Sequence, residues 1–164
     1  MKQDFLTRSG EPADHLDALS PIEASAVIYW RLWAQGEQGR RRVHADFDTA
    51  LGAHAGSDAV GALSQIFDIC ARHCRRPLTH CALGCKCLGA DERCFADFIG
   101  YASECNREDA ALVASLLVNP NLCLLLATHA QTFGLALRRM ACAPPLTRTN
   151  SGVKRTAPKS RTIH

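Results

Sequence analysis

Apolar residues recur every three or four positions along most of the chain, and glycine or proline falls between these periodic stretches. This spacing is typical of amphipathic helices, and no stretch shows the strict alternation of a β-strand. Because the links between the periodic stretches are short, we expect an all-α fold: a compact, mostly orthogonal bundle of about six helices. The predicted helices begin near Ser20, Gln38, Ser57, Asp91, Asn106 and Asn119.

Local signals mark where several helices begin and end. Residues 20–23 form a capping box with proline at the first helical position, where its missing N–H costs nothing. Gly36 and Gly52 follow the first two periodic stretches, and glycine tolerates the left-handed conformation found at helix C-termini. Pro77 prevents the third helix from continuing. These signals predict a single helical domain over residues 20–142.

Charge is distributed unevenly along the chain, whose formal net charge is +3. Residues 1–142 hold 14 basic and 16 acidic residues, whereas residues 143–164 hold five basic residues and no acidic one. The C-terminal stretch is rich in Pro, Ser and Thr, so it cannot bury enough apolar surface to offset its ordering entropy. We expect residues 143–164 to be a disordered basic tail and residues 1–19 to be a flexible N-terminal segment.

Cysteine is concentrated in one part of the sequence. Between Cys70 and Cys94 lie six of the nine cysteines and two of the seven histidines. The chain has no apolar signal-peptide core, and its longest hydrophobic stretch is broken by proline at residue 120, so we expect a cytoplasmic protein without a membrane segment. In a reducing compartment this cysteine density indicates metal binding, reactive thiols or burial rather than a disulfide framework.

Helical spacing divides the cysteines into two groups. Cys70, Cys74 and Cys105 fall on apolar helix stripes, where free cysteine behaves as a small buried hydrophobe. Cys123, inside an apolar run, is expected to be buried for the same reason. The remaining thiols of the run lie in or beside the link formed by residues 75–89. At fifteen residues this link exceeds the usual helix-to-helix length of about 2 to 8, and such loops tend to be functional or tied down.

The loop predicts a metal site, with zinc as the first choice, because thiolate and imidazole ligands are mixed. A workable set combines His80 or Cys81 with Cys85 and Cys87, and Cys74, His73 or Cys94 completes the shell. The spacings match no standard structural zinc site. An iron–sulfur cluster is the alternative, and copper(I) storage is a further one that the proline and glycine breaks oppose. The candidate metal ligands are His80, Cys81, Cys85, Cys87, Cys94 and Cys74.

A thiol redox switch is the other interpretation of the loop. An exposed pair such as Cys81 and Cys85 cross-links only where the Cα atoms approach within about 7 Å. A reactive thiolate also needs a pKa lowered by nearby cations. The cations nearest in sequence are Arg75, Arg76, Lys86 and Arg93.

The basic residues carry a second hypothesis, an interaction or nucleic-acid-binding module in which the cysteines are incidental. Cations near the start of the second helix oppose its dipole unless an acidic group or phosphate lies nearby. Together with the basic tail they form a surface that gains affinity for a polyanion by counterion release. The candidate contacts are Arg40, Arg41, Arg42, Arg75 and Arg76.

Catalytic motifs are sparse. The sequence has no glycine-rich phosphate loop, no H-E-x-x-H pair, no nucleophile elbow and no C-x-x-C pair, and Asp91 and Glu92 have the spacing of solvated acids. A thiol-dependent enzyme is therefore the third hypothesis. The first is a small metal-binding or redox-responsive regulatory protein, with a protein or nucleic acid as partner.

Overall fold

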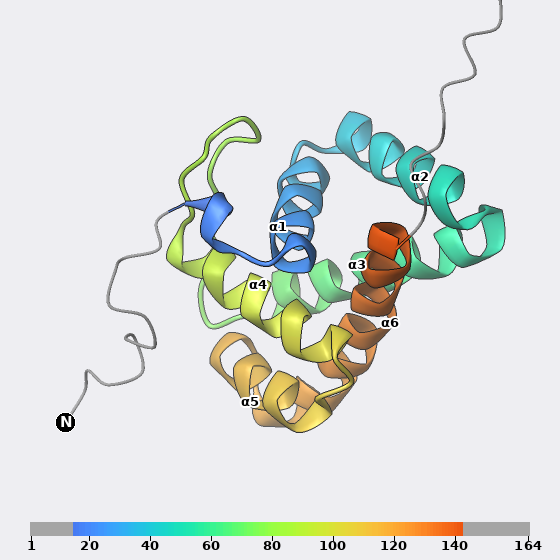
Figure 1. The fold of residues 1–164 in the computed structure, drawn as a ribbon. Helices are drawn as coiled ribbons and strands as arrows, with labels where there is room; N and C mark the ends of the chain where they lie inside the picture. Colours follow the sequence, from blue (N-terminus) through green and yellow to red (C-terminus); the bar gives the residue numbers. More distant parts are fainter. Residues whose placement is uncertain (1–14, 143–164) are drawn as a thin grey trace, which may run out of the picture.

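The structure is a computed structural model that describes residues 15–142. In this range six α-helices follow a short 3-10 turn, η1 (Leu16–Ala18), and no β-strand occurs, which confirms the all-α prediction. Figure 1 shows helices running in several directions around α6, an arrangement compatible with the mostly orthogonal packing predicted. The helices are α1 (Pro21–Ala34), α2 (Glu37–Leu51), α3 (Ala53–His73), α4 (Ala90–Ser103), α5 (Arg107–Leu117) and α6 (Cys123–Cys142), with a 3-10 turn η2 (Pro120–Leu122) before α6.

The predicted capping box at the start of α1 is confirmed. The Ser20 hydroxyl accepts a hydrogen bond from the Glu23 amide, and the Glu23 carboxylate accepts one from the Ser20 amide at 2.8 Å. The start of α3 differs from its prediction near Ser57. Gly52, at φ +84°, ends α2, and its carbonyl accepts the amide of Gly56 at 2.8 Å, so α3 begins four residues earlier.

The corner between α1 and α2 brings two backbones into close approach. Gly36 makes the turn at φ +81°. Gly39, in the first turns of α2, is buried so closely against α1 that a Cβ atom there would lie 1.8 Å from the carbonyl oxygen of Leu32. This corner therefore requires glycine at position 39 for lack of space, whereas position 36 favours glycine for its backbone angle.

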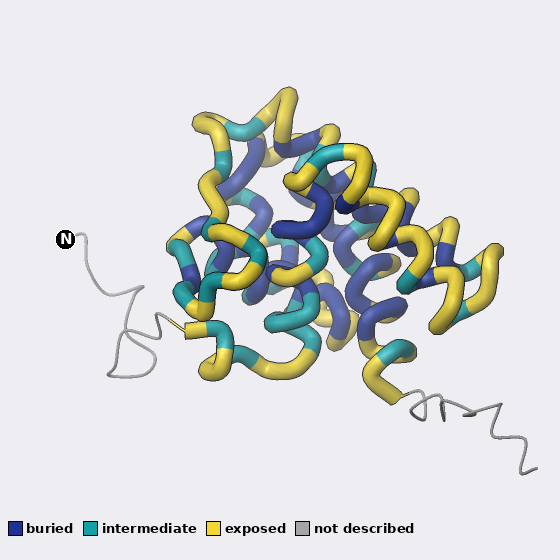
Figure 2. Tube along the Cα trace, turned by 90° about the horizontal axis from the view of Figure 1, so that it is seen from above, coloured by how far each residue is buried: buried dark blue, intermediate teal, exposed yellow. Residues whose placement is uncertain are grey.

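Helix α6 lies in the centre of the core and packs against α3, α4 and α5. Figure 2 shows buried residues along the inner sides of the helices and exposed residues on the outer turns. Cys70 and Cys123 are buried, as predicted, and Cys74 is half-buried. The prediction for Cys105 is wrong: α4 ends at Ser103, and Cys105 is exposed in the following turn at φ +60°.

The N-terminal residues of the described range pack against the long loop. The Leu16 amide donates to the Lys86 carbonyl at 3.0 Å, and His15 forms an isolated antiparallel bridge with Cys87. Residues 15–19 thus belong structurally to the domain, although the sequence assigned them to a flexible segment. Residues 1–14 and the predicted disordered tail lie outside the described residues. Within that range no helix is long and apolar enough to cross a membrane.

Candidate functional site

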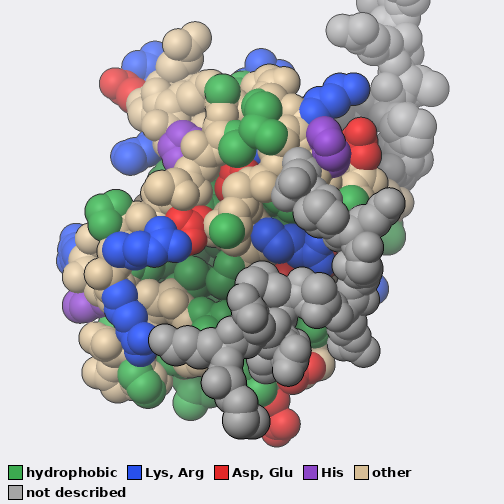
Figure 3. Space-filling view, turned by 90° about the vertical axis from the view of Figure 1, so that its left-hand side faces the viewer, with side chains coloured by type: hydrophobic (Ala, Val, Ile, Leu, Met, Phe, Trp, Pro, Cys, Tyr) green, Lys and Arg blue, Asp and Glu red, His purple; other side chains and the backbone are tan. Residues whose placement is uncertain are grey.

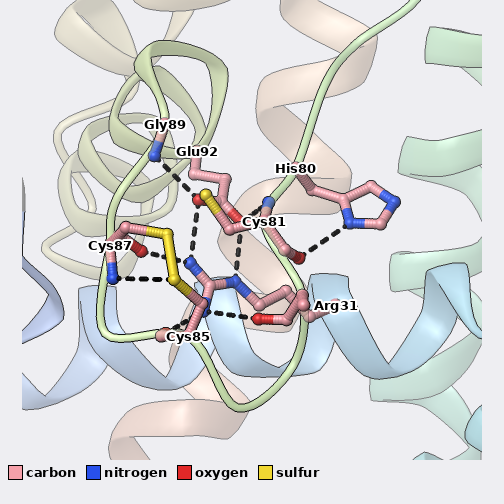
Figure 4. Close-up of a disulfide and its surroundings, with 8 residues drawn as sticks. Arg31, His80, Cys81, Cys85, Cys87, Gly89 and Glu92 are labelled. Atoms are coloured by element: carbon pink, nitrogen blue, oxygen red, sulfur yellow. Dashed lines mark hydrogen bonds and ion pairs between the residues drawn. A yellow bond between two sulfur atoms is a disulfide. The ribbon is translucent and has the colours of Figure 1, made fainter.

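A buried ion pair lies beneath the loop that connects α3 to α4. Arg31 of α1 is 1% exposed and Glu92 in the first turn of α4 is 0% exposed. The Arg31 Nε atom donates to Glu92 Oε1 at 2.7 Å, and Nη2 donates to Oε2 at 2.9 Å, as Figure 4 shows. This two-pronged geometry is the strongest form of a carboxylate–guanidinium contact. The pair joins two helices through residues that are 61 positions apart in sequence.

The same two side chains also hold the backbone of the loop. Arg31 donates through Nη1 to the carbonyls of Ala82 at 3.2 Å and Cys85 at 2.6 Å, and through Nη2 to that of Cys87 at 2.6 Å. Glu92 accepts the backbone amides of Cys81 at 3.0 Å and Gly89 at 2.9 Å. The long loop is therefore tied down, as its length led us to expect, and an ion pair from the helices ties it.

A second anchor fixes the beginning of the loop. Asp91, next to Glu92, accepts both Nη atoms of Arg76 at 2.8 and 2.6 Å. It also accepts the amide and the hydroxyl of Thr79 at 2.8 and 3.0 Å. The interpretation of Asp91 and Glu92 as solvated acids is wrong, because both are buried under the loop that they hold. Sequence reasoning missed this role and missed Arg31, for which one signal existed: it is a charged residue inside an apolar stretch of α1.

The two buried carboxylates have pKa values near 2. Hydrogen bonds from Arg76 lower the pKa of Asp91 from 3.8 to about 2, against a smaller effect of burial. Burial by itself raises the pKa of Glu92, but hydrogen bonds from Arg31 and from the Gly89 and Cys81 amides outweigh it and bring the pKa from 4.5 to about 2. Both groups therefore remain charged in the folded protein at moderately acidic pH.

The lowered pKa values of Asp91 and Glu92 predict that the folded protein loses stability in acid. Between pH 5 and 2 the unfolded chain binds protons at these two carboxylates while the folded protein does not, so the free energy of unfolding falls as the pH is lowered through that interval. Urea unfolding measured at half-unit pH steps tests this. An Asp91→Asn variant should be less stable than the wild type at pH 6 and should lose less stability on acidification. Equal pH slopes for the two proteins would contradict the assignment.

The loop contains a disulfide between Cys85 and Cys87, whose Cα atoms are 5.3 Å apart. Figure 4 shows this disulfide beside the Arg31 guanidinium, which holds the carbonyls of both cysteines. Cys81 remains a free thiol. From the sequence we predicted that Cys81 and Cys85 are a pair able to cross-link. We predicted Cys85 and Cys87 as neighbouring metal ligands. The structure instead joins Cys85 to Cys87, because the turn of three residues already places their Cα atoms at disulfide distance.

The free thiols near the site are stabilised in their protonated form. Burial, followed by the neighbouring Glu92 carboxylate, raises the pKa of Cys81, and Arg31 only partly opposes this. Burial likewise raises the pKa of Cys94 to about 11 and raises that of Cys74. A thiol with a raised pKa is a weak nucleophile at neutral pH. A thiol-dependent enzyme stays a prediction.

Of the six candidate metal ligands, Cys85 and Cys87 are joined in the disulfide, whereas Cys74, Cys81 and Cys94 are free thiols. The His80 Nδ1 atom faces the Cys81 carbonyl at 3.0 Å, and the His80 ring lies 6.3 Å from that of Trp30. Cys74 lies at the C-terminal end of α3 and is half-buried. In residues 15–142 no three His, Cys, Asp or Glu side chains gather in a group able to hold a metal ion.

The arginines of the second hypothesis occupy several different environments. Arg40 lies over the ring of Trp33, 5.1 Å from its centroid, and Arg41 pairs with Glu37 one helical turn away. Arg42 and Arg75 are exposed, and Arg76 pairs with Asp91. On the face in Figure 3, Lys and Arg side chains stand in separate groups with hydrophobic and acidic side chains between them. Nucleic-acid binding by these residues stays a prediction.

Comparison with known proteins adds no resemblance to this description. No protein-family model, no curated protein and no solved structure matches the chain. The function is therefore inferred from the geometry of the loop and of the ion pair beneath it.

Proposed function

We propose that this protein is a small redox-responsive regulatory or binding protein, and that the Cys85–Cys87 pair is its responsive group. One observation carries the proposal: the carbonyls of both cysteines are bound by Arg31, which is itself paired with Glu92 in the core. Any change at the sulfur atoms therefore acts on a backbone segment that is connected directly to α1 and α4. A reducing compartment such as the cytoplasm suits this role, because the pair then forms only under oxidising conditions.

The chemical step is thiol–disulfide exchange. A thiolate of glutathione or of a protein dithiol attacks one sulfur of the pair, and the mixed disulfide then resolves with a second reductant thiol. The Cys85–Cys87 bond gains two electrons and two protons and becomes two thiols, while the two reductant thiols become a disulfide. Oxidation of the pair is the reverse exchange with an oxidised thiol of the same class.

This step changes how η1 docks on the domain. The Lys86 carbonyl between the two cysteines accepts the Leu16 amide. Leu16 and Leu19 pack against a small apolar cluster of Val27, Leu88 and Ala96. Movement of residues 85–87 removes one contact of η1, and release of η1 uncovers this cluster as an apolar surface for a protein partner.

Hydrogen exchange of the Leu16 amide tests the proposal. With the pair reduced, this amide should exchange at least about tenfold faster than in the oxidised protein, while core amides of α6 exchange at the same rate. A Cys85→Ser, Cys87→Ser variant should exchange as the reduced protein does in every redox buffer, and Cys105→Ser should respond as the wild type does. Identical Leu16 exchange in the oxidised and reduced proteins would overturn the proposed output.

The zinc site predicted from the sequence stays a prediction that depends on the same pair. Metal ligands must be thiolates, so Cys85 and Cys87 can bind zinc only after reduction. Metal analysis of protein purified under anaerobic, reducing conditions tests it. Stoichiometric zinc that is lost in the Cys85→Ser, Cys87→Ser variant would favour a metal-binding role. Metal-free protein would contradict the zinc site and leave the redox role as the only one proposed for this pair.

A further inference from the structure

An apolar pocket of about 540 Å³ opens beside the first residues of the loop, away from the disulfide. Its walls include the rings of Trp30, Trp33 and Phe67, and the last two rings are stacked with centroids 6.0 Å apart. His80 closes one side, and Figure 4 shows its ring turned away from Cys85 and Cys87. The volume falls within the range of about 300 to 1,000 Å³ that small-molecule sites occupy.

The charged residues that line this pocket are basic. Arg75 and Arg76 line it, no acidic residue does, and Arg40 lies over the Trp33 ring that forms one wall. Arg76 is already paired with Asp91, whereas Arg75 is exposed and makes no ion pair with any residue that the structure describes. The pocket therefore offers flat aromatic walls together with one cation that remains available to a ligand.

We propose that this pocket binds a small planar aromatic anion, such as an aromatic carboxylate or sulfonate. Trp and Phe walls favour a flat apolar ring through stacking and burial. The Arg75 guanidinium presents two parallel N–H donors that match two oxygens of a carboxylate or a sulfonate, and it forms charge-assisted hydrogen bonds with them. The site does not include Cys85 or Cys87, so it goes beyond the redox role and does not depend on it.

The chain provides its own reporter for this site. It has two tryptophans, and both line the pocket. The probe is 8-anilinonaphthalene-1-sulfonate, an aromatic anion with a flat naphthalene ring that accepts excitation energy from tryptophan. We expect saturable binding of one probe per chain, with quenching of tryptophan emission. The neutral N-phenyl-1-naphthylamine should bind several-fold more weakly.

Two pairs of variants separate charge from shape. Arg75→Gln should weaken sulfonate binding about five- to tenfold and leave the neutral probe unchanged, because only the charge-assisted contact is lost. Arg72→Gln, an exposed arginine at the same end of α3 that does not line the pocket, is the matched control. Ala71→Phe adds bulk at the pocket wall and should weaken both probes, whereas Ala45→Phe on exposed α2 should weaken neither.

Several outcomes would overturn this site. Equal sulfonate affinity in Arg75→Gln and Arg72→Gln would remove the role of Arg75. Binding of several probes per chain, or binding that Ala71→Phe does not weaken, would place the probe elsewhere. Thermal unfolding followed by near-UV circular dichroism accompanies each titration, and a variant is used only if it unfolds cooperatively. Leu16 exchange in the redox experiment is read independently, so failure of either proposal leaves the other measurable.

Discussion

Replacing Glu92 by glutamine is expected to lower the free energy of unfolding by about 3 to 5 kcal/mol, the usual cost of removing one partner of a fully buried ion pair. Both side chains are inaccessible to solvent, so water cannot solvate the Arg31 charge that remains. The new amide group also faces N–H donors: Arg31 on one side and the backbone of Gly89 and Cys81 on the other. At least one donor therefore loses its acceptor.

Urea unfolding followed by far-UV circular dichroism measures this loss. Arg93→Gln is the control, because Arg93 and Asp97 form an ordinary pair one helical turn apart on a partly exposed surface of the same helix. Such a pair contributes about 0.3 to 0.5 kcal/mol, so the control should be nearly neutral. Similar losses in the two variants would show that burial of the Arg31–Glu92 pair has no special effect.

A double variant, Arg31→Leu with Glu92→Leu, distinguishes this pair from an isolated buried salt bridge. Replacing both members of an isolated pair by apolar residues is often neutral or stabilising. Here the replacement also leaves the carbonyls of Ala82, Cys85 and Cys87 without their donor. We therefore expect the double variant to remain destabilised and its loop amides to exchange faster than those of the wild type.

Gly39→Ala is expected to destabilise the protein by about 3 kcal/mol through overpacking at the α1–α2 corner. The new Cβ atom would lie 1.8 Å from the Leu32 carbonyl oxygen, and a backbone atom cannot move aside as a flexible side chain can. Helix propensity acts in the opposite direction, because alanine is better than glycine in a helix by about 1 kcal/mol. The packing effect is expected to exceed it.

Gly61→Ala is the matched control for this substitution. Gly61 lies within α3, and a Cβ atom there would meet no other atom within 4 Å. With no clash, only propensity remains, so we expect a gain of about 0.5 to 1 kcal/mol. Opposite signs for the two variants in thermal unfolding are the predicted result. Stabilisation by Gly39→Ala would contradict the close approach of the two helices.

Much of the fold could be predicted because helix formation depends on local patterns. The three-to-four spacing of apolar residues, the capping box at Ser20 and the positive-φ glycines at 36 and 52 all act within one or two turns of chain. The start of α3 was missed because a single glycine serves two helices. Spacing defines a helix face but does not determine what covers it: Leu112 and Leu116 of α5 are 67% and 65% exposed.

The candidate site was predictable in part. The sequence located the loop of residues 75–89, its unusual length and its thiols, and it named Cys85 and Cys87 as neighbours. It gave a wrong environment to Asp91 and Glu92, because two acids at the start of a helix have the same pattern whether they are solvated or buried. Arg31 could not be assigned to the loop, because nothing local connects residue 31 with residues 82–92.

By itself, the sequence determined which segments are helical and where the cysteines gather, since both follow from residue types and short-range spacing. Only the tertiary structure decided what holds the loop. The buried pair of Arg31 and Glu92 exists because α1 and α4 pack together, and it binds backbone groups whose identity no side-chain pattern reveals. Contacts between residues distant in sequence set burial and pKa. For this reason the candidate site is an ion pair beside a disulfide, whereas the sequence predicted a cluster of thiols.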